Sequence, residues 1–193
     1  MTTATQPYAS LQEFAALIAQ ALGGEWKRST RFDAEDRNWR AELEGPGEQR
    51  LFLSNTWANK GRLYIGGEFP TGAQLPYKAD RPSITVDASK SAQQIAKDIT
   101  RRLLPPYVEL LATVLKMKSD ADTFETGRQK LAQDVAEVVG GRVQSEMVHG
   151  WGGWSFQVSS PTSIRVYSNT AYLTLEQLRK IKDVCPELFE RQA

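Results

Sequence analysis

Residues 11–24 read LQEFAALIAQALGG and residues 131–141 read LAQDVAEVVGG, and these two stretches decide the predicted fold. In both, apolar residues recur three and four positions apart and a pair of glycines follows. That spacing places apolar side chains on one face of an amphipathic helix, and glycine commonly ends such a helix. Ser10 precedes the first stretch, where its hydroxyl can cap the helix. The sequence therefore predicts two helices of one design, 117 residues apart.

Strand-like segments follow each glycine pair in the same order. The second strand of each half alternates apolar and polar residues around a Trp, Trp39 or Trp154, as expected for paired strands with a buried face. The third strand of each half runs into an identical Ser-Asn-Thr tripeptide, which is the sharpest sign of a repeat. In chain order, the predicted pairs are residues 25–28 and 142–145, 38–43 and 153–158, and 50–53 and 164–167.

A second helix is predicted to close each half. Ser91 to Gln94 and Thr174 to Gln177 both fit the capping box that opens a helix. The first half is longer and adds a strand at 62–65, a Gly/Pro-rich loop at 66–82 and a strand at 84–86. After Pro105-Pro106, a short helix is predicted to join the halves.

These elements predict an α+β fold of two tandem α-β-β-β-α units, each an antiparallel sheet with its helices packed on one face. The predicted boundaries are 8–104 for the first unit, 105–121 for the connecting helix and 122–190 for the second unit. Glycine ends many helices, so any single match could arise by chance. The shared order of helix, glycine pair, Trp, Pro and Ser-Asn-Thr favours internal duplication.

Composition excludes several classes of protein. Hydrophobic residues make up 40% and charged residues 24% of the 193 residues, values typical of a globular chain. The net charge of +1 provides no field that would steer the protein to nucleic acid or to an anionic membrane. Neither a signal peptide nor a membrane-spanning apolar run is recognisable, so a cytoplasmic protein without membrane contact is expected.

No reactive constellation stands out, so a non-enzymatic protein without cofactors is expected. Cys185 and His149 lack the setting of a nucleophile and its base, and one Cys with one His cannot build a structural zinc site. The carboxylates of Asp33, Glu35 and Asp36 could hold a divalent cation, as in a metal-dependent hydrolase. An acidic turn between strands is more often a solvated loop, and the second half has no counterpart to it.

Two turns carry the leading functional hypothesis. Exposed Trp beside Arg or Lys is typical of binding hot spots and of platforms that stack bases. Trp39 and Trp154 are predicted to be core residues of paired strands, whereas the two turns are predicted to contact a partner. The predicted partner-binding residues are Trp57, Asn59, Lys60 and Arg62 in one turn and His149 and Trp151 in the other.

The basic residues of the second helix carry the alternative. Residues 91–119 hold 5 basic and 2 acidic residues, and Lys97, Arg101 and Arg102 recur along one helix. They could contact the phosphates of a nucleic acid, although such a stripe is more often a solvated helix face. The order α-β-β-β-α is similar to that of double-stranded-RNA-binding domains, but neither half shows the basic loop and helix start that those domains use.

The sequence therefore predicts a macromolecular binding protein, an adaptor or inhibitor of a larger protein complex, with nucleic-acid binding as the alternative. Partner, pathway and oligomeric state are not readable from these residues.

Overall fold

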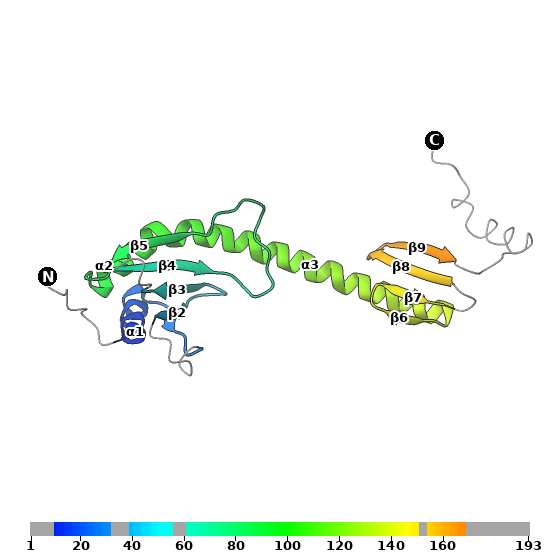
Figure 1. Ribbon diagram of the computed structural model, residues 1–193, viewed down its shortest axis with the longest axis horizontal. Coiled ribbons are helices and arrows are strands. Elements are labelled where there is room, and N and C mark those ends of the chain that lie inside the picture. The colour runs from blue at the N-terminus through cyan, green and yellow to red at the C-terminus, as the bar shows by residue number, and fades with distance from the viewer. Residues whose placement is uncertain (1–9, 32–38, 56–60, 151–153, 169–193) are drawn as a thin grey trace, which may run out of the picture. The chain divides into compact units, whose positions relative to one another are not determined.

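The computed structural model describes residues 10–31, 39–55, 61–150 and 154–168. The chain has an α+β fold in which antiparallel sheets pack against helices, as predicted (Figure 1). It divides into two compact units, residues 1–119 and 120–193. Unit 1 holds a five-stranded sheet in the order β1-β2-β3-β4-β5, and unit 2 holds a four-stranded sheet in the order β6-β7-β8-β9.

Helix α1, Leu11–Leu22, begins and ends as the sequence predicts. The Ser10 hydroxyl accepts a hydrogen bond from the Glu13 N–H at 3.1 Å, which satisfies one free donor of the first turn. Gly23 follows the last turn with φ of 72°, a left-handed conformation that glycine adopts without strain. The apolar face of α1 is buried against the sheet, with Phe14 and Ile18 at most 3% exposed.

The sheet of unit 1 is a simple antiparallel meander. Its strands are β1 (Lys27–Arg28), β2 (Arg40–Glu44), β3 (Arg50–Ser54), β4 (Arg62–Glu68) and β5 (Ser83–Asp87). Alternate residues form one continuous apolar face, because directly paired residues point to the same side. The core on that face is completed by residues of α1, of α2 and of the helical segment that follows it. The core side chains of the sheet are Ala41, Leu43, Leu51, Leu53, Leu63, Ile65, Ile84 and Val86.

The predicted loop at 66–82 begins three residues too early, because Gly66, Gly67 and Glu68 lie inside β4. Neither position has room for a β-carbon: one at Gly66 would overlap the Phe52 ring, and one at Gly67 would overlap the Tyr107 ring. Glycine here serves close packing inside a strand rather than a turn.

The helical segment after β5 is continuous from Ala92 to Val139. Helix α2, Ala92–Asp98, starts with the predicted capping box, in which Ser91 and Gln94 bond each other's backbone N–H. A π-helical stretch, η2 (Ile99–Leu103), leads into α3 (Leu104–Val139). The Leu104 N–H donates to the Ile99 carbonyl, the wide bond of a π-helix. Pro105 and Pro106 have no N–H to give to the preceding turn, which accounts for the local widening.

The predicted short connecting helix and the predicted helix at 131–139 are therefore one element, α3. The prediction that the connecting helix is separate was wrong. Two prolines were interpreted as a helix break, but a π-helical turn accommodates them.

Unit 2 packs β6 (Arg142–Gln144), β7 (Met147–His149), β8 (Trp154–Ser160) and β9 (Ser163–Ser168) against the last turns of α3. Val148 and Val158 are at most 1% exposed and lie against Ala132 and Val135. The sequence missed β7 and placed a turn around His149 instead. The turn lies earlier, at Ser145, whose φ is 58°. The helix predicted to open at Thr174 lies outside the described residues.

Candidate functional site

One end of the sheet in unit 1 brings together residues from the starts and ends of three strands. Trp39 directly precedes β2, and its carbonyl accepts a hydrogen bond from the Asn55 N–H at 3.2 Å, just beyond the end of β3. Arg62, the first residue of β4, is exposed and donates from Nη2 to the Thr85 carbonyl at 3.4 Å. Asp87, the last residue of β5, is the ladder partner of Arg62. The candidate binding site is this end of the sheet, where Trp39, Asn55 and Arg62 lie at the ends of β2, β3 and β4.

The turn that sequence analysis selected connects β3 to β4 at this same sheet end. Of its predicted partner-binding residues, only Arg62 belongs to the part of the chain that the structure describes; Trp57, Asn59 and Lys60 lie outside it. The described residues on both sides of the turn, Asn55 and Gly61, are tied to the sheet. The Gly61 carbonyl accepts from the Ala88 N–H at 2.9 Å. The sheet therefore fixes both ends of the turn.

Trp39 was predicted to be a core residue, and that prediction was wrong. The side chain is 48% exposed. Trp39 stands one residue before the paired part of β2, so the alternation of the strand does not carry it into the core. Trp154, its counterpart in the predicted repeat, is partly buried within β8. An exposed Trp at the candidate site is a feature that sequence analysis assigned to the core.

A cluster of charged side chains lies on the sheet face opposite the apolar core, and it extends from Arg40, next to Trp39, to Glu68 at the other end of β4. Arg40 Nη2 is 2.9 Å from Glu42 Oε1 and 2.8 Å from Glu68 Oε2. The guanidinium lies 4.9 Å from the centre of the Phe52 ring, within the range of a cation–π contact. Glu42 is only 3% exposed, whereas the side chain of Glu68 keeps 29% of its surface in contact with solvent.

The cluster holds two carboxylates and one guanidinium. Burial and the neighbouring charge of Glu68 raise the pKa of Glu42, while Arg40 opposes the rise. For Arg40, burial would lower the pKa, but the two carboxylates outweigh it and raise the pKa further. Glu42 therefore takes up a proton more readily than an ordinary glutamate, and Arg40 stays charged.

Tyr107 of α3 ties this cluster to the helix layer. Its phenol donates to the Glu68 carbonyl at 2.8 Å and accepts from the Arg50 N–H at 2.8 Å. Arg50 and Glu68 face each other across β3 and β4, so the phenol bridges the end of the ladder. Burial raises the pKa of Tyr107 to about 12. The backbone that carries the Glu68 side chain is thus held from the opposite side of the sheet.

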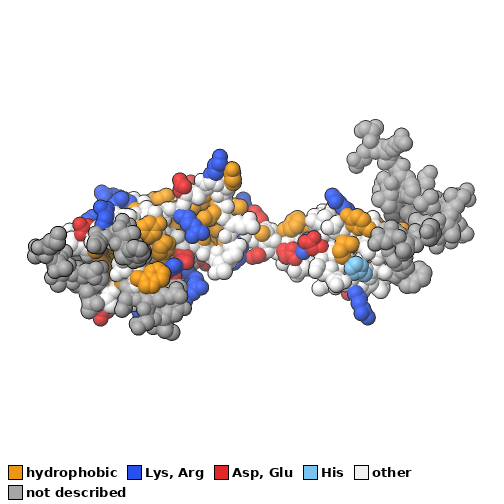
Figure 2. Space-filling model, in the orientation of Figure 1, with side chains coloured by type: hydrophobic (Ala, Val, Ile, Leu, Met, Phe, Trp, Pro, Cys, Tyr) orange, Lys and Arg blue, Asp and Glu red, His pale blue; other side chains and the backbone are white. Residues whose placement is uncertain are grey.

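The second predicted turn belongs to unit 2. His149 is the last residue of β7, exposed, with Nδ1 3.2 Å from the Ser155 Oγ. It was predicted to lie in a turn and lies in a strand opposite Arg142 instead. Trp151 lies outside the described residues. Figure 2 shows the histidine (pale blue) at the surface of this unit.

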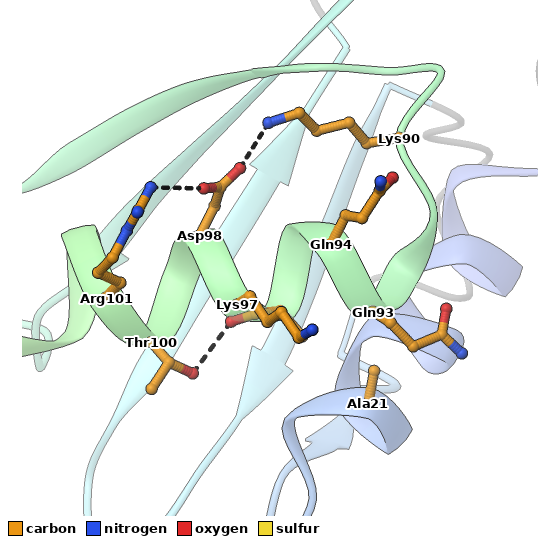
Figure 3. A pocket seen from close by; sticks show the side chains of 9 residues that line it. Ala21, Lys90, Gln93, Gln94, Lys97, Asp98, Thr100 and Arg101 are labelled. Carbon is orange, nitrogen blue, oxygen red and sulfur yellow. Dashed lines mark hydrogen bonds and ion pairs between the residues drawn. The ribbon is translucent and has the colours of Figure 1, made fainter.

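Two basic residues of the alternative hypothesis, Lys97 and Arg101, line a hollow of about 740 Å³ over α2 and η2. Lys90 Nζ is 2.7 Å from Asp98 Oδ2, and Arg101 Nη2 is 3.4 Å from Asp98 Oδ1. Figure 3 shows Lys90 and Arg101 reaching Asp98 from opposite sides, while Lys97 points away from Asp98. The hydrogen bond from Lys90 lowers the pKa of Asp98. Asp98 therefore offsets two of the cations at this hollow.

The structure brings Lys97 and Arg101 to the rim of this hollow, and it adds Lys90, which sequence analysis did not select. Arg102 is exposed on η2 and does not line the hollow. Lys90 and Asp98 are eight residues apart, and no helix or strand spacing predicts their contact. The contact depends on the conformation of the segment that precedes α2. On the face drawn in Figure 2, basic and acidic side chains are interspersed over unit 1.

The metal alternative is not tested by the structure. Asp33, Glu35 and Asp36 lie outside the described residues, as does Cys185. Within the described ranges, no group of three or more His, Cys, Asp or Glu side chains is arranged to hold a metal ion. No helix among the described residues combines the length and apolar character needed to cross a membrane.

Comparisons with known proteins add no assignment. No family model matches this chain, and neither the curated proteins nor the solved structures gave a significant match.

Proposed function

We propose that this chain is a non-enzymatic binding protein that engages a protein partner through the sheet end of unit 1. The observation that carries the proposal is Trp39, which is 48% exposed although its backbone is fixed by the Asn55 hydrogen bond. A partly exposed Trp provides a large contact area, and Trp is enriched among the residues that dominate binding energy.

The neighbourhood of Trp39 supports the proposal. Arg62 is exposed at the same sheet end, and the turn that carries Trp57, Asn59 and Lys60 joins β3 to β4 there. Arg is also enriched in interface cores, because it combines a flat cation with an apolar stem. Interspersed charges and an aromatic anchor fit a protein partner better than a polyanion. An adaptor or an inhibitor of a larger complex is the role proposed.

The experiment is affinity capture with the full chain, comparing Trp39→Ala and Trp57→Ala with Tyr77→Ala. Tyr77 is a matched control because it is an exposed aromatic, at 91%, in the β4–β5 connection at the other end of β4. We expect a protein recovered by the unaltered chain and by Tyr77→Ala to be lost with the Trp variants, with or without nuclease. Equal recovery by all variants would remove the proposal.

A second candidate is nucleic-acid binding through Lys97, Arg101 and Arg102. The hollow favours it, because Lys97 lies at this concave surface, points away from Asp98 (Figure 3) and can contact a phosphate group. Binding of this kind weakens steeply as salt rises, because each phosphate contact releases counterions. Lys97→Glu with Arg102→Glu should abolish a shift of single- or double-stranded RNA at low salt. A chain that shifts neither RNA nor DNA excludes this candidate.

We also propose that the two units arose by duplication of one segment. In each unit a glycine-terminated helix precedes an antiparallel sheet, and the Trp-bearing strand pairs with the strand that leads into Ser-Asn-Thr. Ser54 pairs with Arg40, the residue after Trp39, whereas Ser168 pairs with Trp154 itself, so the two registers differ by one residue relative to the Trp. Among the described residues the two sheets differ in two ways: unit 2 has β7 between β6 and β8, where β1 pairs directly with β2, and unit 1 continues beyond β3 with β4 and β5. Superposition of the two hairpins in an experimental structure tests this proposal.

A further inference from the structure

The helix-facing side of the sheet in unit 2 carries apolar side chains that remain exposed. Val158 is 1% exposed, yet its ladder partner Ile164 is 42% exposed, and Val166, opposite Phe156, is 55% exposed. Directly paired residues point to the same side of a sheet. Helix α3 therefore covers β8 and leaves the side chains of the edge strand β9 in solvent on the same face.

The flank of α3 that faces β9 is also apolar. Gly127 lies against Pro161 in the β8–β9 turn, and a β-carbon at this glycine would approach the proline ring to 2.9 Å. Leu131 and Val138 follow Gly127 along the same flank, four and eleven residues later, close to whole helical turns. Leu131 is partly buried, while Val138 is 86% exposed. This flank of α3 and the side chains of β9 thus border an uncovered apolar strip, which we call the α3–β9 strip.

The equivalent strip in unit 1 is covered by a helix. At the offset of 117 residues, Leu131 corresponds to Phe14 and Val138 to Ala21. Phe14 is 3% exposed and belongs to the same core cluster as Ala92 of α2. Ala21 also packs against this core, and the two helices border a common groove at these residues. In unit 1, helix α2 therefore covers the residues of α1 that correspond to Leu131 and Val138. It follows β5 after four residues, two strands beyond β3, the counterpart of β9.

An amphipathic sequence, whose apolar residues suit the apolar strip, follows β9 after five residues. Leu175, Leu178 and Ile181 recur three residues apart, which places them along one side of a helix, and charged residues lie between them. Thr174 and Gln177 have the capping-box spacing that Ser91 and Gln94 show before α2. Residues 169–173 precede this segment and can reach about 17 Å when extended, enough to turn back over the edge of β9.

We propose that residues 174–185 dock as an amphipathic helix on the α3–β9 strip, as the unit 2 counterpart of α2. Docking would remove Ile164, Val166 and Val138 from water, and burial of apolar side chains stabilises the folded chain. The inference rests on the proposed duplication for the choice of occupant, and on the exposures of Ile164, Val166 and Val138 for the existence of the strip.

The experiment uses a nitroxide spin label on the lone Cys185 of the full chain, with methyl-labelled Ile and Val observed by NMR. A second label position, Lys180→Cys with Cys185→Ser, controls for interference by a label on the apolar side of the segment. We expect the oxidised label to broaden the methyl signals of Ile164, Val166 and Val138 relative to the reduced label. Leu178→Asp with Ile181→Asp should restore these signals, whereas Arg179→Asp should not.

Two results would overturn the proposal. In one, neither label position broadens the methyl signals of the strip. In the other, the broadening appears when spin-labelled chains lacking isotope are mixed with isotope-labelled chains lacking the spin label, which would assign the strip to a second copy. The duplication proposal is tested separately. If the two hairpins did not superimpose, that proposal would fail, but the broadening within one chain would still show that the segment docks on the strip.

Discussion

The phenol of Tyr107 donates a 2.8 Å hydrogen bond to the carbonyl of Glu68, whose carboxylate binds Arg40 on the opposite face of the sheet. One residue is thus held by the helix layer through its backbone and by the charged cluster through its side chain. This arrangement connects the packing of α3, at one end of β4, to Arg40, which directly follows Trp39 of the candidate binding site.

Removing the Tyr107 hydroxyl should destabilise unit 1. Tyr107→Phe keeps the buried ring but takes away the acceptor of the Arg50 N–H and the donor to Glu68. Loss of partners at buried polar groups costs about 1–3 kcal/mol of the free energy of unfolding. Chemical denaturation followed by circular dichroism measures this change, and an unchanged midpoint would contradict the bridging role.

The same phenol predicts how stability depends on alkaline pH. The pKa of Tyr107 rises from 10.0 to about 12 in the folded chain, so the folded state favours the protonated phenol. The stabilisation is fully present below pH 10 and is lost as the pH rises through about 12. Denaturation midpoints between these limits should fall less steeply for Tyr107→Phe than for the unaltered chain. Parallel slopes would show that another group dominates.

Gly67→Ala should also destabilise unit 1, for a steric reason. A β-carbon at Gly67 would overlap the Tyr107 ring, and overpacking of a core costs about 1–3 kcal/mol. The loss should persist in the background Tyr107→Phe, which keeps the ring, and should shrink in the background Tyr107→Leu. Double-mutant cycles of thermal midpoints compare the loss from Gly67→Ala in the two backgrounds. An equal loss with Tyr107→Phe and with Tyr107→Leu would contradict direct contact between Gly67 and the ring.

The charged cluster predicts a pH-dependent effect of Arg40. Arg40→Met leaves the buried Glu42 beside Glu68 without a cation, and breaking a buried pair in this way costs about 3–5 kcal/mol. Protonation of Glu42 relieves the cost, and its pKa is already raised. The stability gap between Arg40→Met and the unaltered chain should therefore narrow as the pH is lowered from 7.

Glu42→Gln is the matched control for this prediction. An amide can still accept from Arg40 and donate to Glu68, and it carries no charge to bury. Its unfolding midpoint at pH 7 should stay near that of the unaltered chain. A loss as large as that of Arg40→Met would indicate that the ionised form of Glu42 is required.

Asp98 predicts the opposite dependence on acid. The Lys90 hydrogen bond lowers the pKa of Asp98, so its contribution is present above the usual aspartate range and is lost as the pH falls through the lowered value. Lys90→Met should flatten the acid limb of the stability profile, whereas Lys97→Met, on the same surface without this contact in Figure 3, should leave it unchanged. Identical acid limbs in all three chains would exclude the pair as a source.

Local signals allowed much of the fold to be predicted. Apolar spacing, Ser10 and Gly23 located α1, and the Ser91 capping box located the start of α2, because each signal acts within a few residues. The sequence could not show that Pro105 and Pro106 are accommodated by a π-helical turn, or that Gly66 and Gly67 make room for two rings. Those outcomes depend on partners far away in the chain.

The site was less predictable for the same reason. Glu42 alternates with Ala41 and Leu43 and was therefore interpreted as an ordinary polar strand residue, although it is buried by distant contacts. Trp39 was assigned to the core because the strand was predicted to begin at residue 38, whereas β2 begins at Arg40. The charge partners of Arg40 come from β2 and β4, and no spacing in the sequence relates them.

The most direct test of the proposed binding role places a photo-crosslinking amino acid at position 39, and in a second chain at position 77, before irradiation in extract of the native host. The account predicts a single protein adduct from position 39 that survives nuclease treatment and is absent from position 77. Equal adducts from both positions, no adduct from either, or an adduct that nuclease removes would contradict it.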